Sequence, residues 1–219
     1  MKRLVVVCAG PGSLHEINRW TRRDLRTFTL WIIWYGEPSE AFATETADRV
    51  FFDRGSKWDL IRRRAADITA SGATWIWLPD DDLALHVEDV NLFFDMCEDQ
   101  APGIAQPSLV PRNASVQDLI HVPQGEAVRF TRFVEIQMPC FSSLVWPRVV
   151  QLLEENPDIR SGWGFDIVWS RWPYRKVVHN ATVAFHTRAV NIEGGFYKAL
   201  GIDPCEEREL VLKKYTCKK

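Results

Sequence analysis

Residues 75–85 read WIWLPDDDLAL, in which an apolar run is followed directly by three carboxylates. The run WIWL is typical of a buried β-strand, because it is short, apolar on both faces and rich in aromatic residues. Asp80, Asp81 and Asp82 repel one another, and each would be more stable in water. In open α/β sheets, ligands bind beyond the carboxyl ends of the strands. The stretch therefore predicts an α/β fold with a binding site at the end of this strand.

Apolar strands alternate with helical segments through the first half of the chain. One helix is predicted over residues 57–70, where apolar residues such as Trp58 and Ile61 fall on one stripe. The other elements predicted here are strands within residues 4–10, 27–36, 48–53, 74–78 and 103–107, a polar helix around residues 14–23 and a helix over residues 87–97. Apolar strands separated by helices predict a parallel sheet with helices on both faces.

The second half is less regular, and its pattern predicts a mixed topology. The predicted elements are strands within residues 127–143 and 176–190, helices within 144–155 and 206–215, and a loop that leads into a helix within 161–172. No linker rich in proline, glycine or serine separates the halves. We therefore expect a single domain over residues 1–219.

Charge and composition bear on the partners of the protein. The net charge of −2 gives no support for nucleic-acid binding, which needs a clustered basic surface. Arg62, Arg63 and Arg64 form a tight basic run, but on a helix they point in different directions, which favours a solvated face. No run of about 18 apolar residues is present, so no membrane span is expected.

Cysteine usage and the N-terminus indicate the compartment. The five cysteines are odd in number and include no CxxC pair, which favours neither a disulfide framework nor a zinc site. The N-terminal apolar run is too short for a signal peptide, and a Gly-Pro-Gly turn follows it. We therefore expect a reduced, cytoplasmic protein.

Asp80 and Asp82 are candidates for a metal site. They are one residue apart, so at a strand end they are expected to lean to the same side. Hard cations such as Mg²⁺ or Mn²⁺ commonly take one or two carboxylates together with substrate phosphates. The alternative is a solvated turn that caps the next helix, since aspartate is a good N-cap.

His186 closes another apolar run, VAFHTRAV. A lone histidine is more often a structural residue than a ligand. Imidazole is nevertheless a competent Mn²⁺ ligand, and a third protein ligand for a metal held by Asp80 and Asp82 has to come from elsewhere in the chain. Both interpretations of His186 remain open from the sequence.

The segment SGWGFD places Trp163 between two glycines, with Asp166 at the start of a predicted helix. The glycines favour close approach of the backbone to a ligand, and Trp163 is the tryptophan that we expect in a pocket. Most of the ten tryptophans instead lie in apolar strands and are expected in the core. Asp166 fits either a helix-terminal aspartate or a general base aimed at an acceptor hydroxyl.

Seven segments of the chain, taken in order, resemble the family called domain of unknown function 707, which is regarded as related to glycosyltransferases of the GT-A fold. They are RGSKWDLI, WIWLPDDDLAL, AQPSL, RFTRFVEIQMPCFS, SGWGFDIVWSRW, AFHTRAV and YKALGIDP. The resemblance runs from about residue 50 to the C-terminus. It implies a GT-A-like Rossmann-type mixed sheet, with a nucleotide-sugar-binding half over residues 1–106 and an acceptor-binding, catalytic half over residues 107–219.

The resemblance also implies an activity. A sugar would move from a nucleotide-sugar donor, most often a UDP-sugar, to a hydroxyl acceptor such as a glycan. Asp80 and Asp82 match the DxD motif that holds Mn²⁺ or Mg²⁺ against the donor diphosphate, and Asp80 thereby also contacts the donor. His186 matches a late metal-binding histidine, and Asp166 matches the catalytic base of inverting members.

Four further residues are expected at the donor. Lys57 would approach the donor from the start of its helix. Tyr35 and Asp53 would line the nucleoside pocket, an expectation that rests on their places at strand ends. Trp163 would form part of the same binding surface.

Three alternatives remain open. A metal-dependent phosphoryl hydrolase also uses strand-end aspartates, and a nucleotide- or sugar-binding module would use the same pocket without turnover. Within the transferase hypothesis, Glu135 in RFVEIQ is the next candidate for the base after Asp166.

Overall fold

The structure is a computed structural model that describes residues 1–13, 19, 21–40, 47–110, 125–188 and 195–216. The nine strands of this part of the chain form one sheet in the order β3-β2-β1-β4-β8-β6-β9-β5, with β7 paired to β9. The strands are β1 (Arg3–Ala9), β2 (Thr29–Trp34), β3 (Arg49–Phe52), β4 (Trp75–Trp77), β5 (Leu83–Ala84), β6 (Ile104–Val110), β7 (Val128–Thr131), β8 (Cys140–Ser142) and β9 (Lys176–His186).

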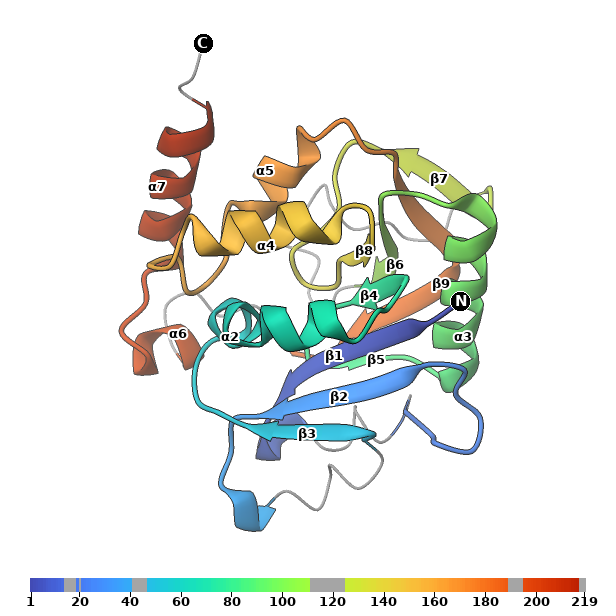
Figure 1. Cartoon of the computed structure of the whole chain (residues 1–219), viewed down its shortest axis with the longest axis horizontal. Coiled ribbons are helices and arrows are strands. Elements are labelled where there is room, and N and C mark those ends of the chain that lie inside the picture. Colours follow the sequence, from blue (N-terminus) through green and yellow to red (C-terminus); the bar gives the residue numbers. More distant parts are fainter. Residues whose placement is uncertain (14–18, 20, 41–46, 111–124, 189–194, 217–219) are drawn as a thin grey trace.

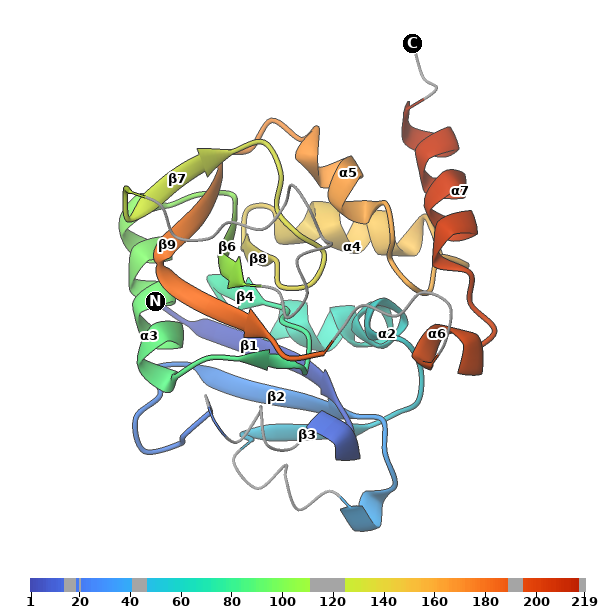
Figure 2. The same ribbon diagram turned by 180° about the vertical axis from the view of Figure 1, so that it is seen from behind.

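Strand direction explains where the functional residues gather. Strands β3, β2, β1 and β4 are parallel to one another. Strand β8 is antiparallel to both β4 and β6, and β9 is parallel to β6, so β9 runs in the same direction as β4. The carboxyl ends of β1, β2, β3, β4 and β9 therefore share one edge of the sheet, and His186 lies at the same edge as the three aspartates (Figures 1 and 2).

Helices cover both faces of the sheet. They are α2 (Lys57–Ala70), α3 (Val87–Gln100), α4 (Trp146–Glu154), α5 (Phe165–Ser170), α6 (Phe196–Ala199) and α7 (Pro204–Thr216), and a short 3₁₀ turn, η1 (Pro11–Ser13), follows β1. Figure 1 shows α2 and α4 across one face, with α5 and α7 beyond them, while α3 lies apart from this group.

Two hydrophobic clusters fill the space between the sheet and the helices. On one face Val6 of β1 packs in a cluster with Trp58 of α2 and Trp169 of α5. On the other face Val7 belongs to a cluster with Phe93 of α3. The alternation of β1 side chains between the clusters follows from the period of two in a strand, and burial of both faces explains why the strand is apolar throughout.

The structure confirms most of the elements predicted for the first half, including the helix over residues 57–70 and helices on both faces. Most of the helix predicted around residues 14–23 lies outside the described residues. The second half has the predicted mixed topology. Two elements differ from expectation: residues 176–186 form one long strand, and the pair Leu83–Ala84 forms the short strand β5, which is too short for a periodicity signal. Strand β5 pairs with the end of β9, and this pairing holds Leu83 opposite His186.

Candidate active site

The three aspartates after β4 point to three different partners. Asp80 pairs with Lys57, Asp81 accepts hydrogen bonds from Tyr35 and Ser13, and Asp82 faces His186. The repulsion is reduced at Asp80 by the ammonium of Lys57 and at Asp81 by two hydroxyl donors. The backbone of the turn is held by the neighbouring chain, since the amide of Asp80 donates to the carbonyl of residue 137 at 2.7 Å.

Lys57, at the first position of α2, neutralises Asp80. Its Nζ lies 2.6 Å from Asp80 Oδ1 and donates to the carbonyls of Gln137 at 2.8 Å and Ile136 at 3.2 Å. The Lys57 side chain is 15% exposed, so its ammonium is engaged within the protein. Lys57 thus lies at the predicted site, with its charge directed at Asp80.

Asp82 and His186 lie close to each other, and both side chains are potential metal ligands. His186 Nε2 lies 3.3 Å from Asp82 Oδ2, and the two side chains are 8% and 13% exposed, respectively. The next residue, Thr187, fixes the geometry because its amide donates to the Asp82 carbonyl at 2.9 Å and its hydroxyl donates at 2.7 Å.

Burial disfavours charge on both members of this pair. Burial, followed by the charges of Asp80 and Asp81, raises the pKa of Asp82 to about 7. Burial also lowers the pKa of His186 below its ordinary value. A neutral imidazole is the form that binds metals, and a cation between the two side chains would favour the ionised carboxylate.

The donor set fits a divalent cation in part. Asp82 Oδ1 is buried and has no hydrogen-bond partner among the described residues, so its lone pairs are available to a cation. In the same part of the chain, however, no group of three or more His, Cys, Asp or Glu side chains is arranged to hold a metal ion. Asp82 and His186 could supply two ligands, and Oδ1 of Asp80 is engaged by Lys57. Mg²⁺ commonly completes its shell with waters and substrate phosphates.

Asp166 lies in the first turn of α5, as predicted, and its Oδ1 accepts from the amide of Ile167 at 2.8 Å. Burial raises the pKa of its carboxyl to about 6. A base with a pKa near the working pH is effective, because it is ionised and still has affinity for a proton. The position thus suits both interpretations of Asp166, the helix-terminal residue and the general base.

The glycines beside Trp163 have a structural role. Gly162 and Gly164 have φ values of 76° and 94°, which other residues rarely adopt. A Cβ on Gly162 would lie 2.2 Å from the indole of Trp58, and one on Gly164 would lie 3.1 Å from Val211. Protein side chains fill the space beside both glycines. The two glycines therefore permit close packing of Trp58 and Val211, and the approach of a ligand to this backbone stays a prediction.

Trp163 is half-buried and packs edge-to-face against Tyr197 of α6, with ring centroids 6.4 Å apart. Burial, followed by the negative charge of Asp80, raises the pKa of Tyr197 to about 12, which places this phenol within the field of the carboxylates. Tyr197 was not predicted as a site residue. It lies in the segment YKALGIDP, whose pattern carries no chemical signature, so only the fold could reveal it.

Glu135, the second candidate base, is 6% exposed and lies in the connection between β7 and β8. Its Oε1 is buried without a hydrogen-bond partner among the described residues. Burial, then the charges of Asp166 and Asp80, raises its pKa to about 8. Glu135 thus lies within the electrostatic influence of both Asp166 and Asp80.

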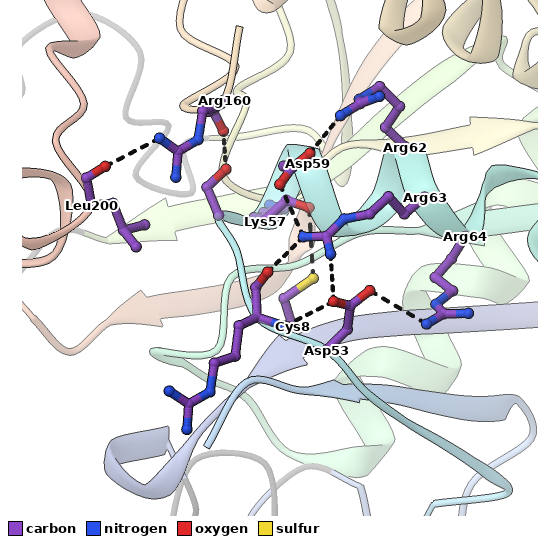
Figure 3. A network of polar contacts seen from close by, with 11 residues as sticks. Cys8, Asp53, Lys57, Asp59, Arg62, Arg63, Arg64, Arg160 and Leu200 are labelled. Atoms are coloured by element: carbon purple, nitrogen blue, oxygen red, sulfur yellow. Dashed lines mark hydrogen bonds and ion pairs between the residues drawn. The ribbon is translucent and has the colours of Figure 1, made fainter. Parts of the chain in front are cut away.

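Asp53 is held by α2. Figure 3 shows its carboxylate between Arg63 and Arg64; Arg63 donates to it, and Arg64 Nη2 lies 3.3 Å away. Arg62 pairs with Asp59 at 2.6 Å. The side chains of the three arginines are 28–34% exposed and all form ion pairs, so the basic run is partly solvated and pairs with Asp53 and Asp59. Asp53 lies at the strand edge as expected, with its charge neutralised by α2.

Tyr35 follows β2 and packs over the turn after β1. A Cβ on Gly10 would lie 2.1 Å from the Tyr35 ring, so only glycine permits this contact. The Tyr35 hydroxyl donates to Asp81 Oδ2 at 2.8 Å, and burial raises the pKa of the phenol well above its ordinary value. Tyr35 therefore links the β1 turn to the three-aspartate turn at the sheet edge.

Comparison with known proteins adds the class of fold. No protein-family model and no curated protein matches this sequence. Among solved structures, residues 1–349 of S. aureus TarS in complex with UDP-GlcNAc superpose with a TM-score of 0.58 at 10% identity, over 87% of this chain and 60% of that one. The same TarS fragment in complex with UDP gives a TM-score of 0.55 at 9% identity, over 100% of this chain and 73% of that one.

The fold is GT-A-like. TarS is a glycosyltransferase of that fold, and the mixed sheet with helices on both faces agrees with it. Another S. aureus TarS structure superposes with a TM-score of 0.55 at 11% identity, over 99% of this chain and 43% of that one. The chain thus spans less than two thirds of the first TarS structure that it matches. The resemblance to domain of unknown function 707 stays a prediction. No helix among the described residues is long and apolar enough to cross a membrane.

Proposed function

We propose that this protein is a glycosyltransferase that moves a sugar from a nucleotide-sugar donor to a hydroxyl acceptor. The observation that carries the proposal is the arrangement of Asp80, Asp82 and His186 at one edge of a GT-A-like sheet, where such sheets bind ligands. The TarS structures that share the fold contain UDP-GlcNAc and UDP, which favours a UDP-sugar as the donor.

Asp82 and His186 would hold Mn²⁺ or Mg²⁺, and Asp80 would be released from Lys57 to join them. When bound, such an ion supplies positive charge that stabilises the leaving diphosphate. Lys57, once separated from Asp80, would have an ammonium to direct at the donor. In this proposal Lys57 neutralises whichever anion occupies the site, first Asp80 and then a phosphate.

Asp166 would act as the general base. The acceptor hydroxyl loses its proton to the carboxylate as its oxygen attacks the anomeric carbon, and the bond to the diphosphate breaks on the opposite side. A single displacement of this kind inverts the anomeric configuration. The raised pKa of Asp166, about 6, supports this role. Glu135 is the second candidate, with a pKa of about 8.

Trp163 and Tyr197 would contact a sugar ring. Aromatic rings present a broad apolar face that packs against a sugar ring. Tyr197 packs against Trp163, and the negative charge of Asp80 contributes to the raised pKa of Tyr197. Trp163 would therefore bind the donor sugar or the adjoining acceptor.

A thermal-shift experiment with UDP and UDP-GlcNAc, each with and without Mn²⁺, tests the proposal. A ligand that binds the folded state raises the melting temperature by mass action, by an amount that grows with its concentration. We expect a rise with both nucleotides that is larger in Mn²⁺. No rise with any of a panel of nucleotide sugars would refute the proposal. Release of inorganic phosphate from simple phosphate esters would instead identify a phosphoryl hydrolase.

A further inference from the structure

Arg188 lies at the candidate site, and the proposed chemistry does not use it. It follows His186 by two residues, just beyond the carboxyl end of β9. Its Nη1 lies 3.7 Å from Asp81 Oδ1, its Nη2 donates to the Gly12 carbonyl, and its side chain is 43% exposed. Arg188 therefore reaches from the end of β9 to the turn after β1, where it contacts Gly12, and to Asp81 in the turn after β4.

Asp81 is fixed from two sides. Its Oδ2 accepts hydrogen bonds from the Tyr35 hydroxyl at 2.8 Å and from the Ser13 hydroxyl, while its Oδ1 faces Arg188. Tyr35 is itself held against Gly10, and the Gly10 amide donates to Ser13 Oγ at 3.0 Å. Asp81 thus sits in a rigid frame formed by the ends of β1 and β2. Its carboxylate is directed at Arg188, whereas its two neighbours face Lys57 and His186.

The site needs positive charge in addition to Lys57 if it is to bind a nucleoside diphosphate. Asp80, Asp81 and Asp82 are acidic, and a nucleoside diphosphate is an anion as well, so binding needs cations. Lys57 is close to Asp80 at 2.6 Å. The 3.7 Å separation between Arg188 and Asp81 is longer than a hydrogen bond, so the carboxylate orients the guanidinium through charge without a direct hydrogen bond. Guanidinium groups bind phosphate oxygens in a bidentate manner.

We propose that Arg188 is an anion-binding residue for the diphosphate of the donor, and that Asp81 is the positioning residue that directs its guanidinium. This inference rests on the proposed function, because it assumes a nucleoside diphosphate in the site. The proposal gives Asp81 a role different from those of Asp80 and Asp82. Asp81 contributes geometry, and Arg188 contributes the contact with the ligand.

Calorimetric titration with UDP and with uridine, both in Mn²⁺, separates the phosphate contact from the nucleoside contact. Arg188→Gln should weaken UDP binding by about tenfold to a hundredfold, the span expected for loss of a hydrogen bond to a charged group. Uridine should bind Arg188→Gln as it binds the wild type. Arg22→Gln is the matched control, because it removes the same charge from an exposed side chain that pairs with Asp24.

Asp81→Asn separates a charge effect of Asp81 from a positioning effect, because the two predict opposite changes in UDP affinity. If Asp81 acted through its charge alone, removing a carboxylate near a bound anion would strengthen UDP binding. The positioning role predicts weaker UDP binding, with no change in the Mn²⁺ concentration that gives half of the maximal binding. Loss of a metal ligand would raise that concentration. Tighter UDP binding in Asp81→Asn, or a higher Mn²⁺ requirement, would overturn the assignment of Asp81.

A double-mutant cycle checks that the two residues act together. In the Arg188→Gln background, Asp81→Asn should cause little further loss of UDP affinity, because there is no guanidinium left to direct. Fully additive losses would contradict the positioning role. Ser13→Ala removes one hydroxyl donor to Asp81, so it carries the test if Asp81→Asn does not fold. We expect weaker UDP binding and unchanged uridine binding in Ser13→Ala.

The wild-type protein distinguishes failure of this inference from failure of the proposed function. If the wild type binds neither UDP nor other nucleoside diphosphates in Mn²⁺, the proposed function is wrong and the inference falls with it. If the wild type binds UDP and Arg188→Gln binds it equally tightly, the inference alone is wrong.

Discussion

The imidazole Nε2 of His186 lies 3.3 Å from Asp82 Oδ2, although Asp82 directly precedes β5 in the first half of the chain and His186 ends β9 in the second. Strand β5 makes this contact possible, because it begins directly after Asp82 and pairs antiparallel with the last residues of β9. The hydrogen bonds from Thr187 to the Asp82 carbonyl hold the two ends together. The pairing therefore joins the two proposed metal ligands through the backbone as well as through their side chains.

Asp82→Ala should abolish the dependence of UDP binding on Mn²⁺. The substitution removes a carboxylate with an unpartnered buried oxygen, and this oxygen is the strongest structural indication of a cation position. The measurement is a calorimetric titration with UDP at several Mn²⁺ concentrations. Asp99→Ala, at an exposed position on α3, serves as the charge-matched control. Unaltered Mn²⁺-dependent binding in Asp82→Ala would show that the metal assignment is wrong.

Asp166→Asn should lower turnover by about 10²–10⁴-fold with donor affinity nearly unchanged, because the amide keeps the shape of the side chain but cannot accept the proton. A role in the helix terminus alone predicts a stability loss on the order of 1 kcal/mol, with turnover per folded molecule intact. Turnover and melting temperature measured on the same variant separate the two. Full activity would transfer the role of base to Glu135 or indicate a retaining mechanism.

Glu135→Gln should change how stability depends on pH. The folded-state pKa of Glu135, about 8, lies above its ordinary value of 4.5, so the folded protein binds the proton more tightly than the unfolded chain does. This contribution is fully present below about pH 4.5 and is lost as the pH rises through 8, at up to about 1.4 kcal/mol per pH unit.

Glu135→Gln removes this titration. Chemical denaturation at pH 5 and at pH 9 should therefore show a smaller fall in the free energy of unfolding for the variant than for the wild type. Equal falls in the two proteins would mean that Glu135 titrates near its ordinary pKa. Glu126→Gln is the matched control, because Glu126 is exposed.

Gly162→Ala should destabilise the protein by more than Gly72→Ala does. Both glycines have positive φ values, 76° and 66°, so both substitutions carry backbone strain on the order of 1 kcal/mol. The added methyl group would also meet Trp58 at position 162, whereas nothing lies within 4 Å at position 72. Overpacking costs a further 1–3 kcal/mol or so. Equal losses of melting temperature would show that Trp58 shifts without cost.

The sequence was sufficient to predict most elements of the first half. Strands β1, β2 and β4 and helix α2 follow from local patterns, since each is long enough or apolar enough to carry its own periodicity. The order of these elements was enough to predict a parallel arrangement, because helices between strands force crossover connections. The same reasoning predicted correctly that the aspartates lie at the carboxyl edge of the sheet.

Only the tertiary structure decided which residues face one another at that edge. Nothing local indicates that Asp80 turns to Lys57, Asp81 to Tyr35 and Asp82 to His186. Strand β5 has two residues, too few for any pattern, yet its pairing sets the register of the site. Local sequence determines elements because periodicity acts over a few residues. Side-chain partners depend on register and strand order, which arise from contacts between segments far apart in the chain.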